Sequence, residues 1–163
     1  MCLKKYADNA PYAPPGGARI NVSVTETGET IMAEKKQSPS MDEWLREAKQ
    51  HESAKDIGMY LTHNGTVRST AKAKVRAGAE DTKPVTGMEF SYDQAKVDAI
   101  IEETYRMDGI GYLRVWLNEG HLEVGDDIMY VLVGGDIRPH VIDALQYLVG
   151  RIKNECVVET EIN

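Results

Sequence analysis

One stretch of this sequence constrains the fold more than any other, because it joins an apolar strand to a long amphipathic helix. Residues 128–133 are apolar on both faces, which is typical of a central strand. Gly134 and Gly135 end this run, and Pro139 suits the first turn of the next helix. A Gly-Gly turn before a helix N-terminus is one kind of anion-binding site. The apolar stripe of the helix comprises Val141, Leu145, Leu148 and Ile152.

Hydrophobic periodicity predicts further elements on both sides of this stretch. Ser40 with Glu43, and Ser91 with Gln94, match the capping box that begins many helices. Gly65 predicts a kink late in a strand. The expected strands are 20–24, 59–68, 85–92, 112–117 and a short edge strand near 157–158, and the expected helices are 40–52, 93–107 and 138–153. Residues 69–84 carry Lys72, Lys74, Arg76 and Lys83 without periodicity, which favours a basic loop.

The order of these elements indicates the fold class. After residue 56 it runs β, β, α, β, β, α and a short β. A two-layer α+β fold packs this order economically, with a mixed, largely antiparallel sheet and helices on one side. We divide the chain into residues 1–36, an N-terminal arm with short strands, and residues 37–163, the main domain.

Composition excludes several classes of protein. The net charge of -7 argues against nucleic acid or an anionic membrane as the main partner. The two cysteines, Cys2 and Cys156, lack metal-ligand spacing, so we expect neither a disulfide framework nor a metal site. The sequence shows no secretory signal and no apolar run near ~20 residues, so we expect a cytoplasmic protein.

Two motifs in this order resemble a known family. Residues 65–68 read Gly-Thr-Val-Arg after an apolar strand, and residues 120–126 read Gly-His-Leu-Glu-Val-Gly-Asp. Arg138 then opens a helix that ends at Ile152-Lys153. Over roughly residues 40–155 the chain resembles the large, catalytic subunit of molybdopterin synthase, the MoaE family.

The resemblance implies both a fold and an activity. Members of the family have an α/β-hammerhead-like fold with an added small antiparallel sheet, and they form homodimers. A small ubiquitin-like sulfur carrier (MoaD type) inserts its C-terminal Gly-Gly thiocarboxylate into the pocket. Sulfur passes to cyclic pyranopterin monophosphate, giving the dithiolene of molybdopterin in molybdenum cofactor biosynthesis. The protein itself then needs no bound metal or redox cofactor.

The resemblance also assigns residues, although incompletely. It implies that Arg68 and Arg138 bind the substrate and that Lys153 is catalytic. Ile137 stands where the family has histidine, and Thr160 where it has a second lysine. These departures favour an alternative, a non-catalytic relative that kept the fold as a binding or scaffold protein. A third reading is a ligand-sensing domain unrelated to this pathway.

Each of these residues also has a purely structural reading. Arg68 would then be a surface charge, Arg138 the ion-pair partner of Asp136 or another acid, and Lys153 a cation that complements the helix dipole. The four histidines show no metal spacing, and Tyr112, Trp116 and Tyr130 suit a core or an interface.

Spacing adds a constraint on the site. The 15 residues from Arg138 to Lys153 span roughly 22 Å of helix, too far for one small pterin to contact both. We therefore expect a second subunit to bring its Arg138 to Lys153 of the first.

Overall fold

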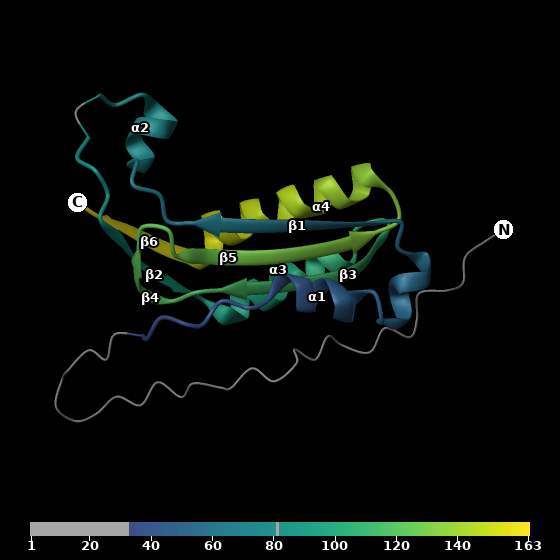
Figure 1. Ribbon diagram of the computed structural model, residues 1–163. Helices are drawn as coiled ribbons and strands as arrows, with labels where there is room; N and C mark the ends of the chain where they lie inside the picture. The colour runs from purple at the N-terminus through teal and green to yellow at the C-terminus, as the bar shows by residue number, and fades with distance from the viewer. Residues whose placement is uncertain (1–32, 81) are drawn as a thin grey trace. The chain divides into compact units, whose positions relative to one another are not determined.

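The computed structural model describes residues 33–80 and 82–163, which belong to one compact unit (Figure 1). Most of the expected N-terminal arm, including its strand at 20–24, lies outside the described residues. The helices are α1 (Met41–Ala48), α2 (Lys72–Ala77), α3 (Gln94–Tyr105) and α4 (Arg138–Arg151), with a 3-10 helix η1 (Glu52–Asp56) and a π-helical turn η2 (Ile152–Cys156). The strands are β1 (Met59–Thr66), β2 (Gly87–Tyr92), β3 (Ile110–Leu117), β4 (Gly120–Glu123), β5 (Asp127–Gly135) and β6 (Val157–Ile162).

The described strands form two three-stranded sheets, both antiparallel. The first has the order β1-β5-β3 and the second the order β4-β2-β6. The apolar strand β5 is central, as its sequence predicts, and the chain tail forms the edge strand β6. A register shift between Gly65 and Thr66 confirms the kink late in β1. The α+β fold-class prediction is therefore confirmed.

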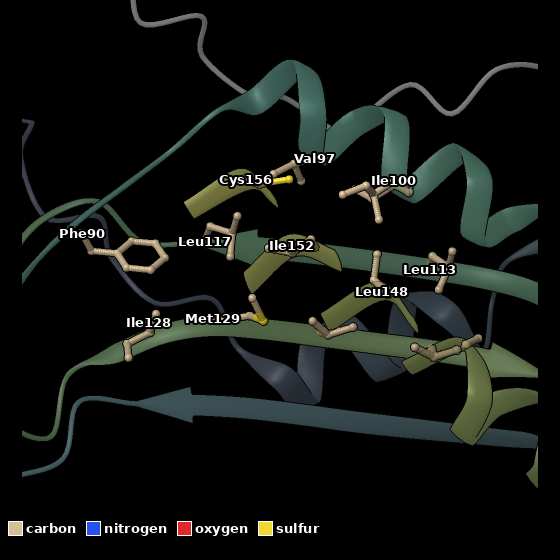
Figure 2. Packing of buried hydrophobic residues seen from close by; sticks show 14 of the residues in the cluster. Phe90, Val97, Ile100, Leu113, Leu117, Ile128, Met129, Leu148, Ile152 and Cys156 are labelled. Carbon is tan, nitrogen blue, oxygen red and sulfur yellow. The ribbon is translucent and has the colours of Figure 1, made fainter. Parts of the chain in front are cut away.

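Helices cover both faces of the first sheet, which corrects the expectation that they lie on one side. On one face, α3 and α4 enclose an aliphatic core that includes Val131, Val133 and Leu148 (Figure 2). On the other face, Trp44 and Ala48 of α1 pack against Leu132 of β5. Because side chains alternate along a strand, the uniformly apolar β5 supplies both cores. Tyr112, Trp116 and Tyr130 pack around α1 together with Tyr60, in keeping with the core or interface role expected of the first three.

One of the two predicted helix caps is correct. The Ser40 hydroxyl accepts a hydrogen bond from the Glu43 backbone N–H at 3.3 Å and begins α1. Ser91 does not cap α3, because it pairs with Val158 inside the sheet. Asp93 takes that role and accepts from the Lys96 backbone N–H at 3.2 Å.

The basic segment contains a short helix, where the sequence predicts only a loop. The Glu161 side chain of β6 accepts hydrogen bonds from the backbone N–H of Lys72, at 2.9 and 3.1 Å, at the first residue of α2. The Lys72 ammonium pairs with Glu159 at 3.1 Å. Gly78 ends the helix with a φ of 66°. Contacts from a distant strand thus organise a segment that lacks periodicity.

Residues before α1 are bonded to the main sheets through Asn118. This fully buried amide accepts hydrogen bonds from the backbone N–H of Lys36 at 2.8 Å and of Glu119 at 3.0 Å. Its Nδ2 donates to the Asp127 carbonyl at 2.8 Å. The Lys36 ammonium also pairs with Glu119 at 3.1 Å.

Candidate functional site

The two sequence motifs meet where β1 ends. The Val67 N–H donates to the Asp126 carbonyl at 2.9 Å, and the Gly125 N–H donates to the Val67 carbonyl at 2.8 Å. Gly125 has a φ of 96°, a conformation that favours glycine. The Asp126 carboxylate accepts from Lys35, and this hydrogen bond lowers the pKa of Asp126 below its usual value. Motifs separated by about a third of the chain thus form one hydrogen-bonded turn.

Arg68 follows this turn and is exposed. Val67 beside it is buried, so the backbone that carries the arginine is fixed while its guanidinium faces solvent. Its Nε donates to the Thr70 carbonyl at 3.1 Å, and within residues 33–80 and 82–163 no ion pair engages the guanidinium. The charge is therefore available to an external anion.

Lys153 lies in the π-helical turn η2, although the sequence predicts a regular helix through this residue. Ile152 and Cys156 of the turn are buried against Val97, Leu117 and other core residues (Figure 2). Burial raises the pKa of the Cys156 thiol, in keeping with a packing role. Lys153 itself is exposed. Such π turns are rare and often accompany functional sites.

His63 is a candidate site residue that the sequence motifs do not mark. It lies on β1 on the same side as Leu61 and Met59, which pack against the aliphatic core. Its Nε2 is buried and has no hydrogen-bond partner among the described residues. Burial lowers the pKa of His63, and the positive charge of Lys153 lowers it further. Strand alternation with Leu61 is the signal that could have placed this histidine toward the core.

Figure 1 shows α4 running beside β1 in the same direction, so the ends of both elements lie together. Arg68 follows the end of β1 and Lys153 follows the end of α4, so both lie at this end of the first sheet. His63, in the middle of β1, is close enough for the charge of Lys153 to act on it. Arg138 begins α4 and lies at the opposite end of the helix, exposed. Within one chain, Arg138 and Lys153 are separated by roughly the 22 Å that helix geometry gives.

The structure also tests the structural reading of Arg138. Asp136 pairs with His140 at 2.7 Å and accepts a hydrogen bond from the Ile137 N–H at 2.6 Å. In the part of the chain described, no acidic group pairs with Arg138. The alternative reading, an ion pair of Arg138 with Asp136 or another acid, is therefore not supported among these residues. The arginine remains at the helix N-terminus, where the dipole disfavours a cation.

Packing accounts for the two glycines before α4. Both lie inside β5 and are buried. A Cβ on Gly134 would lie 2.9 Å from the Tyr60 ring, and one on Gly135 would lie 2.8 Å from the Gly109 carbonyl and from Val141. Close packing of side chains and backbone therefore explains these two glycines, and the predicted anion-binding site gains no support.

The departures from the family pattern are part of β6. Thr160 is exposed and pairs across the sheet with Glu89. Glu159 and Glu161 point to the other side, where both contact Lys72. The acidic tail therefore holds α2, while Thr160 faces solvent on the opposite side of the strand, as Val158 does.

The remaining histidines have partners of their own. His121 pairs with Glu89 at 2.8 Å, and His51 contacts the Ser53 hydroxyl at 2.8 Å. Over the described ranges, no cluster of three or more His, Cys, Asp or Glu side chains is arranged to hold a metal ion. None of the described helices is both long and apolar enough to cross a membrane.

Comparisons with known proteins agree with this architecture. The sequence profile of the family described as MoaE protein matches residues 35–155. Molybdopterin synthase from Staphylococcus aureus is similar in structure, with a TM-score of 0.58, 20% identity and coverage of 76% of this chain and 85% of that chain. The molybdopterin biosynthesis MoaE protein from Burkholderia ambifaria gives a TM-score of 0.59 at 16% identity, covering 78% and 81%.

A third similar structure is a complex of subunits 1 and 2 of the molybdopterin-converting factor from Helicobacter pylori. It has a TM-score of 0.52 and 18% identity, and the match covers 75% of this chain and 78% of that chain. No curated protein sequence matches the chain. At these identities the solved structures establish the fold, while the sequence profile, which spans most of the chain, establishes kinship. The chain belongs to the MoaE protein family.

Proposed function

We propose that this protein is the catalytic subunit of a molybdopterin synthase, acting in molybdenum cofactor biosynthesis in the cytoplasm. It would transfer sulfur from a thiocarboxylated small carrier protein, ending in Gly-Gly, to cyclic pyranopterin monophosphate. Membership in the MoaE family and the names of the similar structures support this proposal. One of those structures is a complex of two subunits, which supports a carrier-type partner.

The observation that carries the proposal is the grouping of Arg68 and Lys153 at one end of the first sheet. Arg68 is fixed by the turn that joins the two family motifs, and Lys153 by the buried residues on either side of it in η2. A guanidinium can donate two hydrogen bonds to one phosphate and keeps its charge. A lysine amine can hold an incoming thiocarboxylate or transfer a proton. Sulfur arrives on the carrier, so these roles require no resident metal or redox cofactor.

The separation of Arg138 from Lys153 supports a site shared between two subunits. Arg138 is exposed and lacks an acidic partner among the described residues, so it can serve a neighbouring molecule. In a homodimer, Arg138 of one subunit would approach Lys153 of the other and bind the same anionic substrate. A monomer by light scattering at micromolar concentration would overturn this arrangement.

Single-turnover conversion of cyclic pyranopterin monophosphate tests the activity. Purified protein is mixed with thiocarboxylated carrier, and product is measured for the native chain and for Lys153→Ala. We expect the variant to lose about 100-fold or more in rate, as when a proton-transferring side chain is removed. Lys49→Ala, an exposed lysine after α1, is the matched control and should react normally. Absence of product from the native chain would overturn the proposal.

Mixing two inactive variants tests the shared site. Arg138→Ala and Lys153→Ala homodimers each lack one component, but a mixed dimer regains one complete site. After subunit exchange, half of the dimers are mixed and each carries one intact site, so about a quarter of the native activity should return. Recovery near zero, with mixed dimers demonstrated by mass spectrometry, would place both residues in the same subunit's site.

A second function, binding without catalysis, is favoured by one observation. Thr160 presents no cation where the resemblance implies a lysine, and the neighbouring glutamates are engaged with Lys72. Because Thr160 is exposed, Thr160→Lys can add the charge without disturbing that contact. Carrier binding with no native activity, and activity gained in Thr160→Lys, would identify a binding protein that has lost its chemistry.

A further inference from the structure

His63 has an unusual setting for a surface strand. Its ring is half-buried, and its Nε2 is enclosed with no hydrogen-bond partner among the described residues. Buried polar atoms are nearly always paired, so an orphaned one invites an explanation such as a missing ligand or ion. A Cβ placed on Gly65, the next residue on this side of β1, would lie 3.7 Å from Nε2 and meet no other described atom within 4 Å. A methyl-sized group over Gly65 would therefore lie beside Nε2 without meeting another described atom within 4 Å.

The surroundings of the ring are apolar except on one side. The residue opposite on β5 is Val131, which belongs to the aliphatic core, and α4 contributes Leu145 and Val149 to the same core. Asp127 of β5 lies on the other face of the sheet, bonded to Ser38 and Asn64. Lys153 of η2 is the charged group whose field reaches the imidazole.

We propose that His63 and Lys153 together form an oxyanion site, in which a bound carboxylate, thiocarboxylate or phosphate group brings a proton onto the His63 imidazole. In the empty site, burial and the neighbouring ammonium both oppose a charged imidazole. An anion held between the two groups cancels the repulsion and accepts a hydrogen bond from Nε2. The site thus takes up one proton from solvent as it binds, and no bond other than that N–H forms.

This inference deepens the proposed function, because the anion at Lys153 would be the carrier's C-terminus or the phosphate of the pterin substrate. The direction of the pH effect follows from linkage. The pKa of His63 is lowered in the free protein and must be higher in the complex if binding takes up a proton. Binding therefore strengthens as pH falls through the pKa of the complex, and it stops strengthening below the pKa of the free protein.

Titration of the histidine Cε1–H signals by NMR measures this effect directly. The chain has four histidines, so the His63 signal is identified as the one missing in His63→Gln. The native protein is titrated alone, with a short peptide ending in Gly-Gly carboxylate, with the same peptide as an amide, and with inorganic phosphate. We expect the pKa of His63 to rise by about one unit or more with an anion, equivalent to about tenfold in affinity across the titration. The peptide amide should leave it unchanged.

The arms of the experiment separate the sources of the anion. A rise with the carboxylate peptide alone assigns the site to the carrier's C-terminus, and a rise with phosphate alone assigns it to the substrate's phosphate. The proposal is overturned if neither anion moves the pKa of His63, or if Lys153→Gln leaves the free value unchanged. His121→Gln, whose side chain is exposed on the second sheet, is the control and should retain the anion effect.

The NMR titration and the activity assay can each overturn one proposal without overturning the other. A protein that shows the anion-linked rise but converts no pterin would retain the oxyanion site and overturn the proposed enzyme. If the protein converts pterin normally but neither anion changes the pKa of His63, the proposed enzyme is retained and the oxyanion site is overturned.

Discussion

The two ends of α4 are held in different ways. At the C-terminal end, Ile152 and Cys156 lie in the core on either side of Lys153. At the N-terminal end, residues 136–139 are all exposed, and the first turn is held by Asp136 through its pair with His140. Its N-cap residue, Ile137, makes no side-chain capping hydrogen bond.

This difference indicates how each cation can act. A residue whose neighbours are buried keeps its backbone position whether or not a ligand is present, as a site within one chain requires. A side chain on an exposed first turn is presented outward, where a second molecule can meet it. The contrast is consistent with Lys153 working in its own subunit and Arg138 working across an interface.

The largest expected effect comes from removing the anchor of the C-terminal end. Ile152→Ala deletes a fully buried side chain, which should lower the free energy of unfolding by about 2–5 kcal/mol through lost burial and a cavity. Ile142→Ala, near the N-terminal end of α4 and 36% exposed, should cost under about 0.5 kcal/mol. Urea denaturation measures both, and similar losses would show that the two ends are anchored alike.

A smaller effect is expected from a glycine beneath the N-terminal end. Gly109 has a φ of 75°, and a Cβ there would lie 2.1 Å from Asp136 Oδ1 and 2.4 Å from His140 Nδ1. Gly109→Ala should therefore lower the free energy of unfolding by about 1–3 kcal/mol through backbone strain and a broken pair. Gly150→Ala, in the last turn, meets no described atom within 4 Å and should instead raise it by about 0.5–1 kcal/mol. If Gly109→Ala instead raised the free energy of unfolding, the Asp136–His140 pair would not be what holds the first turn of α4.

The smallest effect concerns the pair itself. The hydrogen bond from His140, and then the Ile137 N–H, lower the pKa of Asp136 from its usual 3.8. A lowered folded-state pKa contributes stability above the unfolded value and loses it as pH falls through the folded value. Asp136→Asn should therefore be slightly less stable than the native chain near neutral pH, and the difference should vanish in acid. Asp143→Asn, exposed on the same helix, is the control, and an equal pH profile in both variants would contradict this prediction.

The fold could be predicted wherever local sequence and tertiary packing agree. The apolar β5, the amphipathic α4 and the Ser40 cap are all found as the sequence predicts. The predictions failed where a distant strand decides the structure. Ser91 is drawn into the sheet by β6, and α2 is organised by Glu161, which lies 89 residues further along the chain.

The candidate site was predictable only in part, for the same reason. The family motifs marked Arg68, Arg138 and Lys153, and the structure brings two of these to one end. His63 carries no motif, and its relation to Lys153 depends on the packing of η2 beside β1. The π turn itself has no local signature, because burial of Ile152 and Cys156 is set by α3 and the sheet.

The long spacing between paired strands has a consequence during synthesis on the ribosome. Thr66 of β1 pairs with Asp127 of β5, and Gly87 of β2 pairs with Ile162 of β6. Neither of these pairings can form until most of the chain has been made. Synthesis proceeds at about 5–20 residues per second, so β1 remains without its partner strand for several seconds. The nascent chain is therefore exposed to premature association during this interval, and chaperone binding would be concentrated there.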